Sequence, residues 1–421
     1  MSDSATRGAI EAVFRIEAPR LIAALARFTR DLGRAEDLAQ DALVAALEEW
    51  PRQGVPQNPA AWLMATAKHR AIDLFRRDVR RARVHEAIAR EAGDSVIPQT
   101  DPDVDDGDAG DDLLRLMFAA CHPLLPPESR VALTLRVVGG LTTQAIARAY
   151  LLPEPTIAQR IVRAKRTLAE ARVPFEIPRG AEREGRLASV LEVLYLAFNE
   201  GYAATSGEEW MRPDLSHEAL RLARVLCGLA PYEPEAFGLA ALMEIQASRF
   251  AARRGPGGEP VLLLDQNRAR WDPLLVQRGL RALARAERLA DVRGPYVLQA
   301  AIAACHARAR TADETDWAAI VSLYDELLER LPSPVVALNR AVAVGKASGP
   351  QAALDLVDAL ADDPALAHYH WMPSVRGDLL ERLGRRAEAR AEFERAAAMT
   401  GNARERDLLC KRAAKCGEAN G

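Results

Sequence analysis

The feature that most constrains this chain is its nearly unbroken helical spacing of apolar residues. Ala, Leu, Arg and Glu recur at intervals of three and four along most of the 421 residues, whereas alternating runs of β-branched and aromatic residues are almost absent. Hydrophobic residues make up 49% of the chain, which is enough to bury sizeable cores. We therefore predict an all-α protein, and at about 150 residues per domain the length favours two to three domains.

Proline, glycine and aspartate mark the boundaries within this helical pattern. Residues 93–112 combine these three residue types and contain no Lys or Arg, which is typical of an extended acidic linker. A second break, at residues 173–184, carries two prolines close together. We expect helical modules at residues 10–92 and 113–173, separated by the linker, and a longer helical domain at residues 185–416.

The cysteine and hydropathy patterns predict a soluble cytoplasmic protein. The five cysteines are scattered and odd in number, which fits a reducing compartment better than a disulfide framework. The chain begins without the basic and apolar segments of a signal peptide, and no apolar run approaches the roughly 18 residues of a membrane span. His368 and His370 lack companions at metal-ligand spacing, so we predict no catalytic residues, no metal and no cofactor.

The net charge of −3 argues against a strongly basic, autonomous nucleic-acid binder, but the charges are segregated along the chain. The helix expected after Gly33 carries acidic residues on one side, including Asp37, Asp41 and Glu48. This side is either a solvated face or a docking surface for a basic partner.

A basic helix is predicted to begin at Asn58 and Pro59, with the Asn as N-cap and the Pro as the first helical residue. Trp62 stands at the upstream end of a stripe that includes Arg76 and Arg80. Arginines that meet phosphates beside an aromatic ring that stacks on bases suit single-stranded nucleic acid. The alternative is that Trp62 belongs to the core and that the arginines only solvate the helix.

The segment LTTQAIARAY-LLPEP-TIAQRIVRAKRTLAEA is typical of a helix-turn-helix. Four residues of its second helix are expected to face inward: Ile157, Ile161, Ala164 and Leu168. Five are expected to face outward, where Gln and Arg side chains reach base edges in a major groove: Thr156, Gln159, Arg160, Arg163 and Arg166. Leu151 occupies the turn position often given to Gly, so a left-handed conformation there costs about 1–2 kcal/mol. A helical hairpin with a basic solvent face is the alternative.

The order of these segments resembles that of bacterial sigma factors of the extracytoplasmic-function (ECF) type. The resemblance covers residues from about 10 to 172 and rests on AEDLAQDALVAALEEWP, NPAAWLMATAKHRAIDLFRRDVRR, the acidic linker and LTTQAIARAYLLPEPTIAQRIVRAKRTL. It implies a promoter-specificity subunit of RNA polymerase, with region 2 at residues 10–92 and region 4 at residues 113–173. Core RNA polymerase and promoter DNA are the implied partners.

The resemblance also implies roles for single residues. The segment that docks on the clamp helices of the polymerase's largest subunit would contain Asp37, Asp41 and Glu48. The segment that opens and reads the −10 element would contain Trp62, Lys68, Arg70, Arg76, Arg77 and Arg80. The helix that reads the −35 element as duplex would contain Thr156, Gln159, Arg160, Arg163 and Arg166. The acidic linker would either follow a basic channel of the polymerase or act as a solvated tether.

The C-terminal half shows spacings that resemble tetratricopeptide (TPR) repeats. Ile320, Ala353 and Ala389 take equivalent positions about 34 residues apart, as do Tyr324, Val357 and Phe393. We therefore expect a TPR-like α-solenoid after the two small sigma domains, with a generic helical bundle as the alternative.

Two segments of this half, VLYLAFNEGYAAT and LLLDQNRARWD, have no repeat explanation. Both resemble signatures of the ECF subgroup with a TPR-like extension, in which a small DGPF-type protein is commonly encoded nearby and is a possible partner. Their Asp, Glu, Arg and Trp residues could be mistaken for an active site, but ion-paired loop anchors explain them better.

We predict a sigma factor whose C-terminal domain regulates or completes it, and two other functions stay open. One is an autonomous helix-turn-helix regulator with a TPR sensor domain, which has no need for the acidic helix and the Trp62 stripe. The other is a TPR protein-interaction scaffold, which predicts no salt-dependent DNA binding.

Overall fold

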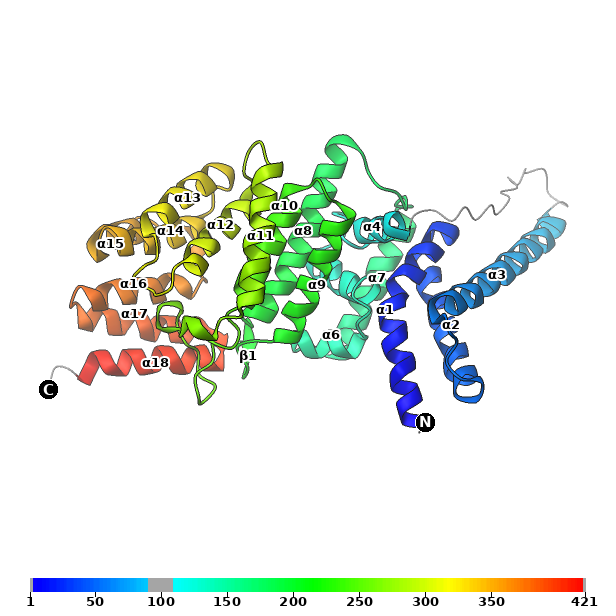
Figure 1. The fold of residues 1–421 in the computed structure, drawn as a ribbon, viewed down its shortest axis with the longest axis horizontal. Helices are drawn as coiled ribbons and strands as arrows, with labels where there is room; N and C mark the ends of the chain where they lie inside the picture. Colours follow the sequence, from blue (N-terminus) through cyan, green and yellow to red (C-terminus); the bar gives the residue numbers. More distant parts are fainter. Residues whose placement is uncertain (1–2, 90–108, 419–421) are drawn as a thin grey trace. The chain divides into compact units, whose positions relative to one another are not determined.

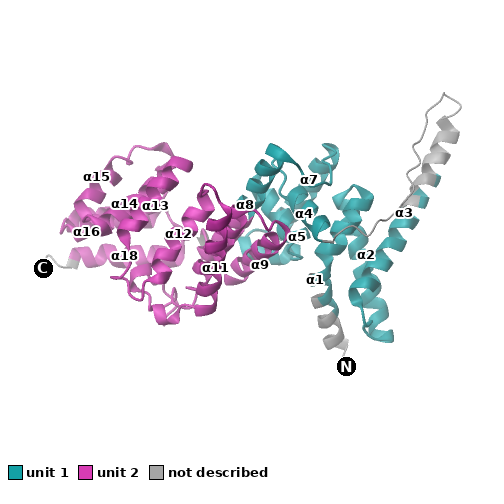
Figure 2. Cartoon of the chain, turned by 45° about the horizontal axis from the view of Figure 1, so that its top comes forward, with its two compact units in different colours: residues 1–193 teal, residues 194–421 magenta. Residues whose placement is uncertain are grey.

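The computed structural model describes residues 3–89 and 109–418 and confirms the all-α prediction. The helices form two compact units, residues 1–193 and residues 194–421 (Figure 2). Most of the predicted acidic linker lies outside the described residues, and its last residues, 109–112, begin a helix. Within the described ranges, no helix is both long enough and apolar enough to cross a bilayer.

The described part of unit 1 consists of helices, the last of which continues into unit 2 (Figure 1). They are α1 (Asp3–Thr29), α2 (Leu32–Gln53), α3 (Pro59–Ala89), α4 (Ala109–Ala120), α5 (Pro127–Val137), α6 (Thr143–Tyr150), α7 (Glu154–Glu170) and α8 (Gly180–Tyr202). The first part of α8 is fastened to α4 and α5: Arg186 donates a hydrogen bond to the carbonyl of Phe118 at 3.0 Å, and Arg130 pairs with Glu192 at 2.9 Å. Unit 1 therefore ends within α8, beyond residue 185, where we expected the C-terminal domain to begin.

Unit 2 continues from the end of α8 as a series of helices, most of which begin at a proline because its fixed φ and missing N–H suit the first helical turn. The helices are α9 (Pro213–Leu229), α10 (Pro234–Ala247), α11 (Pro273–Leu289), α12 (Pro295–Arg308), α13 (Trp317–Arg330), α14 (Pro334–Ala347), α15 (Pro350–Asp358), α16 (Trp371–Arg382), α17 (Arg386–Met399) and α18 (Ala403–Glu418). Short 3₁₀ turns occur at η2 (Leu263–Asp265), η3 (Arg268–Arg270) and η4 (Pro364–Leu366).

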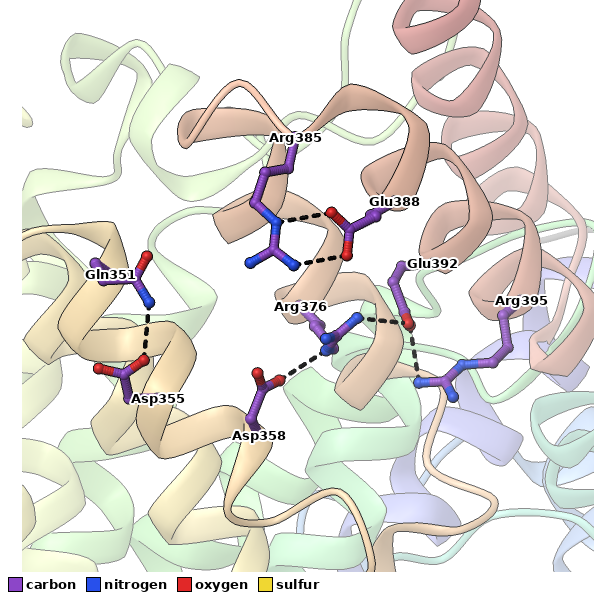
Figure 3. A network of polar contacts seen from close by, with 8 residues as sticks. All are labelled: Gln351, Asp355, Asp358, Arg376, Arg385, Glu388, Glu392 and Arg395. Carbon is purple, nitrogen blue, oxygen red and sulfur yellow. Dashed lines mark hydrogen bonds and ion pairs between the residues drawn. The ribbon is translucent and has the colours of Figure 1, made fainter.

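Successive helices from α12 to α18 pack on one another, as expected for a solenoid of helical pairs. Five of the six residues aligned by the predicted repeat are at most 1% exposed, and the sixth, Tyr324, is half-buried. The five are Ile320, Ala353, Val357, Ala389 and Phe393. On the outside, Arg376 of α16 joins two neighbouring helices, because it pairs with Asp358 of α15 at 2.8 Å and with Glu392 of α17 at 3.0 Å (Figure 3).

Unit 2 is closed by a contact between its two ends. The two-residue strands β1 (Ser206–Gly207) and β2 (Gly401–Asn402) pair in parallel, so the loop after α8 lies beside the start of α18 (Figure 1). Asn402 is fully buried, and its side-chain amide donates to the carbonyls of Ala204 and Glu209, both at 3.2 Å. Residues almost 200 positions apart are thereby held together.

Candidate nucleic-acid interface

The outer face of α2 is acidic with an apolar centre. Asp31 caps this helix by accepting a hydrogen bond from the backbone N–H of Arg34 at 3.0 Å. The predicted residues Asp37, Asp41 and Glu48 are all exposed, on the side opposite the buried Leu38, Ala42 and Trp50. Sequence reasoning missed Val44, which lies among these acids on the same side of the helix and is 49% exposed. An apolar residue ringed by carboxylates suits protein contact better than solvation alone.

Glu36 does not lie on this acidic face, although it directly precedes Asp37 in the sequence. The side chain is 5% exposed, and its carboxylate contacts Nε of Arg136 at 2.6 Å and Nζ of Lys165 at 2.5 Å. Burial by itself would raise the pKa of the Glu36 carboxyl, but Lys165 and Arg136 together hold it below its ordinary value. Glu36 therefore joins α2 to α5 and α7 as a charged group at neutral pH.

The basic helix α3 begins where the capping pattern predicts. Asn58 accepts a hydrogen bond from the backbone N–H of Ala61 at 3.1 Å, and Pro59 is the first helical residue. Trp62 is half-buried and meets Trp50 of α2 edge-on, with ring centroids 5.3 Å apart. Trp62 therefore packs partly against α2 and keeps part of its surface accessible.

The cations predicted on α3 differ in their exposure to solvent. Arg76, Arg77 and Arg80 are exposed, whereas Lys68 and Arg70 are half-buried. Arg70 lies 3.6 Å from Asp41 on α2, which brings one residue of the predicted polymerase site to one residue of the predicted −10 site. The exposed arginines form the stretch of α3 best placed to meet phosphates.

Helices α6 and α7 form the predicted helix-turn-helix. Thr142 caps α6 by accepting a hydrogen bond from the N–H of Ala145 at 3.0 Å, and Leu151 ends α6 in the left-handed conformation, with φ at 50° and ψ at 39°. The four apolar residues of α7 that we expected to face inward, Ile157, Ile161, Ala164 and Leu168, are all buried.

The outward side of α7 carries the predicted recognition residues. Gln159, Arg163 and Arg166 are exposed, and Thr156 and Arg160 are half-buried. Arg166 is engaged with Glu170 at 2.6 Å, so it must exchange this carboxylate for a phosphate or base before it contacts DNA. Val162 is 62% exposed on the same helix, and sequence reasoning missed it; an exposed valine can contact a thymine methyl group.

Comparison with known proteins assigns these elements to a family. Family models match residues 13–81 as Sigma-70 region 2, residues 115–168 as Sigma-70, region 4, and residues 186–287 as a family of unknown function, DUF6596. The chain is a sigma factor of the extracytoplasmic-function type. The region 2 match covers α2 and most of α3, and the region 4 match covers the helix-turn-helix.

Two relatives match this sigma factor over different lengths, and one of them is itself named as a probable sigma factor. It is 44% identical over 388 residues to an uncharacterized protein, R00370, of Rhizobium meliloti (strain 1021), and the match covers 92% of this chain and 91% of that protein. It is 27% identical over 197 residues to the probable ECF RNA polymerase sigma factor SigI of Mycobacterium tuberculosis, a match that covers 44% of this chain and 67% of SigI. Because the match to the first relative covers 92% of this chain, it includes most of the C-terminal extension.

The two C-terminal segments that the repeats do not explain contain loop anchors. Glu200 of the first segment pairs with Arg212, and Asp272 of the second caps α11 by accepting from the N–H of Leu274 at 2.9 Å. Arg268 donates to the carbonyls of His306 and Ala309, at 2.6 and 2.7 Å. These polar residues of the sigma factor are occupied by structural contacts.

Proposed function

We propose that this sigma factor binds core RNA polymerase through the acidic face of α2 and directs initiation at promoters with a −10 and a −35 element. Its region 2 would capture the opened −10 strand with Trp62, Lys68, Arg70, Arg76, Arg77 and Arg80. Its region 4 would read the −35 duplex with Thr156, Gln159, Arg160, Arg163 and Arg166. The observation that carries the proposal is that one chain combines an exposed acidic helix face, a neighbouring arginine helix and a helix-turn-helix with polar side chains outward.

The proposal extends to unit 2, which would regulate or complete the sigma factor. A small DGPF-type protein is the partner suggested by the family resemblance. Run-off transcription with purified core polymerase on genomic fragments tests both the sigma function and the role of unit 2. The full-length chain is compared with a chain that ends after Val193. The truncation keeps Arg186 and Glu192, because both fasten α8 within unit 1.

Failure of the full-length protein to direct any initiation would rule out the sigma function and leave the autonomous regulator or the scaffold. Equal activity of the two chains would rule out only the role of unit 2.

Asp41→Arg is the sharpest test of the polymerase surface. The substitution puts a cation at the centre of the acidic face and repels Arg70, which lies 3.6 Å from the Asp41 carboxylate. We expect core polymerase to bind at least tenfold more weakly, since like-charge contact at an interface costs more than about 1.4 kcal/mol. Glu49→Arg is the control, because Glu49 is also exposed on α2 but lies about 80° around the helix from Asp41 and outside the predicted polymerase contacts. Equal binding by both variants would place the polymerase surface elsewhere.

Arg160→Ala tests the −35 contact. A bidentate contact between a side chain and a base discriminates against the wrong base by about 1–3 kcal/mol. Without Arg160, the preference for the correct base in the upstream element should therefore fall by tenfold or more. Run-off assays on templates with single substitutions across that element measure the change. Arg172→Ala beyond the end of α7 serves as a control for general loss of positive charge. An unchanged preference would remove Arg160 from the reading helix.

A further inference from the structure

Unit 2 contains a cavity of about 260 Å³ that neither the sigma regions nor the repeats require. Its walls come from the loop at 203–210, the turn at 249–253 after α10, the loop at 260–266, the start of α16 and α18. The contact of Asn402 with the carbonyls of Ala204 and Glu209 holds the first of these segments against the last. The two segments that have no repeat explanation thus both contribute residues to the wall of this cavity.

Arg253 is the most unusual residue of this cavity. It is 7% exposed, and its guanidinium lies over two aromatic rings, 3.4 Å from the ring centroid of Tyr202 and 4.4 Å from that of Trp210. It donates one hydrogen bond, to the carbonyl of Tyr202 at 2.8 Å. In the part of the chain that the structure describes, no carboxylate oxygen lies within 4.0 Å of this cation.

A second cation, Arg249, lines the same cavity and is also without an acid. Its guanidinium donates to the side-chain oxygens of Gln246 at 2.8 Å and Gln266 at 3.3 Å, and both acceptors are neutral. Arg412 differs, because Asp378 and Glu381 bind it at 2.7 and 2.5 Å. Two of the three cavity arginines therefore keep a positive charge that no described carboxylate contacts.

The acid on the cavity wall does not neutralise them. Glu405 accepts a hydrogen bond from the hydroxyl of Thr400 at 3.0 Å, and its carboxylate lies 3.3 Å from Nε2 of His370. The Glu405 carboxylate stabilises the charged form of Arg253 through a longer-range attraction, and the two groups do not form an ion pair. In addition, the indole N–H of Trp210 has no acceptor among the described residues. The wall therefore offers unused positive charge and an unused donor.

A buried cation without an acid is costly, so its presence requires a reason. Removing a charge from water costs several kcal/mol, of which the rings of Tyr202 and Trp210 return only a part, about 2 kcal/mol for a desolvated cation–π contact. Burial lowers the pKa of Arg253 to about 10, which leaves it charged at neutral pH. Holding one backbone carbonyl does not need a charge, because a neutral donor does the same.

We propose that unit 2 binds a small organic anion in this cavity, with its charged group at Arg253 and Arg249 and a flat apolar body against Trp210 and Trp371. The apolar part of the wall includes Leu262 and Leu409, so a carboxylate on an aromatic ring matches the site in both charge and surface. The volume is below that of pockets for drug-sized ligands, about 300–1,000 Å³, which restricts the ligand to a small molecule. The site does not depend on whether the chain directs initiation.

Calorimetric titration of the full-length protein with benzoate and indole-3-acetate, each beside its uncharged amide, tests this proposal. We expect at least one acid to bind one molecule per chain, at least tenfold more tightly than its amide, because only the acid reaches the arginines with a charge. Inorganic phosphate should bind more weakly than that acid, since it lacks the apolar body. Equal binding of acids and amides, no binding of either acid, or equal binding of phosphate would overturn the proposal.

Arg253→Met connects the binding to the site. Replacing a buried charge by an apolar side chain of similar length is often neutral for folding, so the variant should unfold at the wild-type temperature and bind the acid at least tenfold more weakly. Arg254→Met is the matched control, because Arg254 pairs with Glu209 at 2.9 Å and does not line the cavity. If Arg253→Met does not fold, Arg249→Gln takes its place. Wild-type affinity in the folded variant would refute the assignment.

Discussion

At the scale of the residue, the left-handed Leu151 shows how a local conformation is kept despite its cost. Its φ of 50° ends α6 and turns the chain into α7, and its side chain is 54% exposed. A Cβ in this conformation costs about 1–2 kcal/mol, and an exposed leucine recovers little of that by packing. The turn is therefore held by its surroundings, such as the hydrogen bond from the N–H of Leu152 to the carbonyl of Ala147 at 3.0 Å.

Leu151→Gly should stabilise the helix-turn-helix. Glycine adopts the left-handed conformation without strain, and after its greater chain entropy in the unfolded state is subtracted, we expect a gain of about 0.5–1 kcal/mol. Native-state hydrogen exchange of amides in α6 and α7 measures the gain. Leu151→Ala keeps the Cβ and should show no increase in protection. A loss of protection in the glycine variant would mean that the leucine side chain contributes packing that outweighs the strain.

At the scale of the element, the pairs of helices in unit 2 combine tight packing inside with ion pairs outside. Gly377 of α16 lies so close to the ring of Phe393 on α17 that an added Cβ would approach the ring to 2.8 Å. The pair of Arg376 with Glu392 links the same two helices, and the pair of Arg376 with Asp358 links α16 to α15 (Figure 3). Packing should dominate, because overpacking a core costs about 1–3 kcal/mol, whereas ion pairs that solvent partly reaches, such as that of Arg376 and Glu392, contribute about 1 kcal/mol or less.

Gly377→Val should therefore destabilise unit 2 by about 2–3 kcal/mol, whereas Arg376→Ala should cost about 1 kcal/mol or less. Urea unfolding of each full-length variant, followed by the fluorescence of Trp371 and the other tryptophans, gives the two values. A larger effect of Arg376→Ala would show that the outer pairs, and not the close helix contact, hold α16 and α17 together.

The elements that could be predicted from the sequence are those whose structure depends on residues close to one another in the chain. The start of α3 at Asn58 and Pro59 and the buried side of α7 follow from capping and from the spacing of apolar residues, which a few neighbouring residues specify. The burial of Glu36 could not be predicted in this way, because its partners lie about 100 or more residues away. The same holds for Arg253, because the residues around it and its cavity come from positions between 202 and 412. Charge type alone does not tell a solvated residue from a buried one.

At the scale of the whole molecule, Glu36 connects the two sigma regions within unit 1. It lies on α2 of region 2, and its partners Arg136 and Lys165 lie on α5 and α7 of region 4. If the proposed function holds, α3 and α7 read promoter elements about 25 base pairs apart, which is about 85 Å of duplex. Both elements cannot be engaged while the carboxylate of Glu36 touches Lys165, so this contact must break when the sigma factor binds its promoter.

Glu36→Gln should weaken this contact in the free protein without lowering run-off transcription. Removing one member of a buried ion pair leaves Arg136 and Lys165 with unpaired charge and costs about 3 kcal/mol, which hydrogen exchange of α2 and α7 measures at neutral pH.

Because the pKa of Glu36 is held below its ordinary value of 4.5, the carboxylate stabilises the fold above that pH, and the stabilisation is lost as the pH falls through the lowered pKa. The difference in unfolding free energy between wild type and Glu36→Gln should therefore be constant near pH 7 and become smaller in acid. Asp37→Asn, one residue along and exposed, should show neither effect. Loss of transcription in Glu36→Gln would mean that the contact is needed in the working complex and does not have to break.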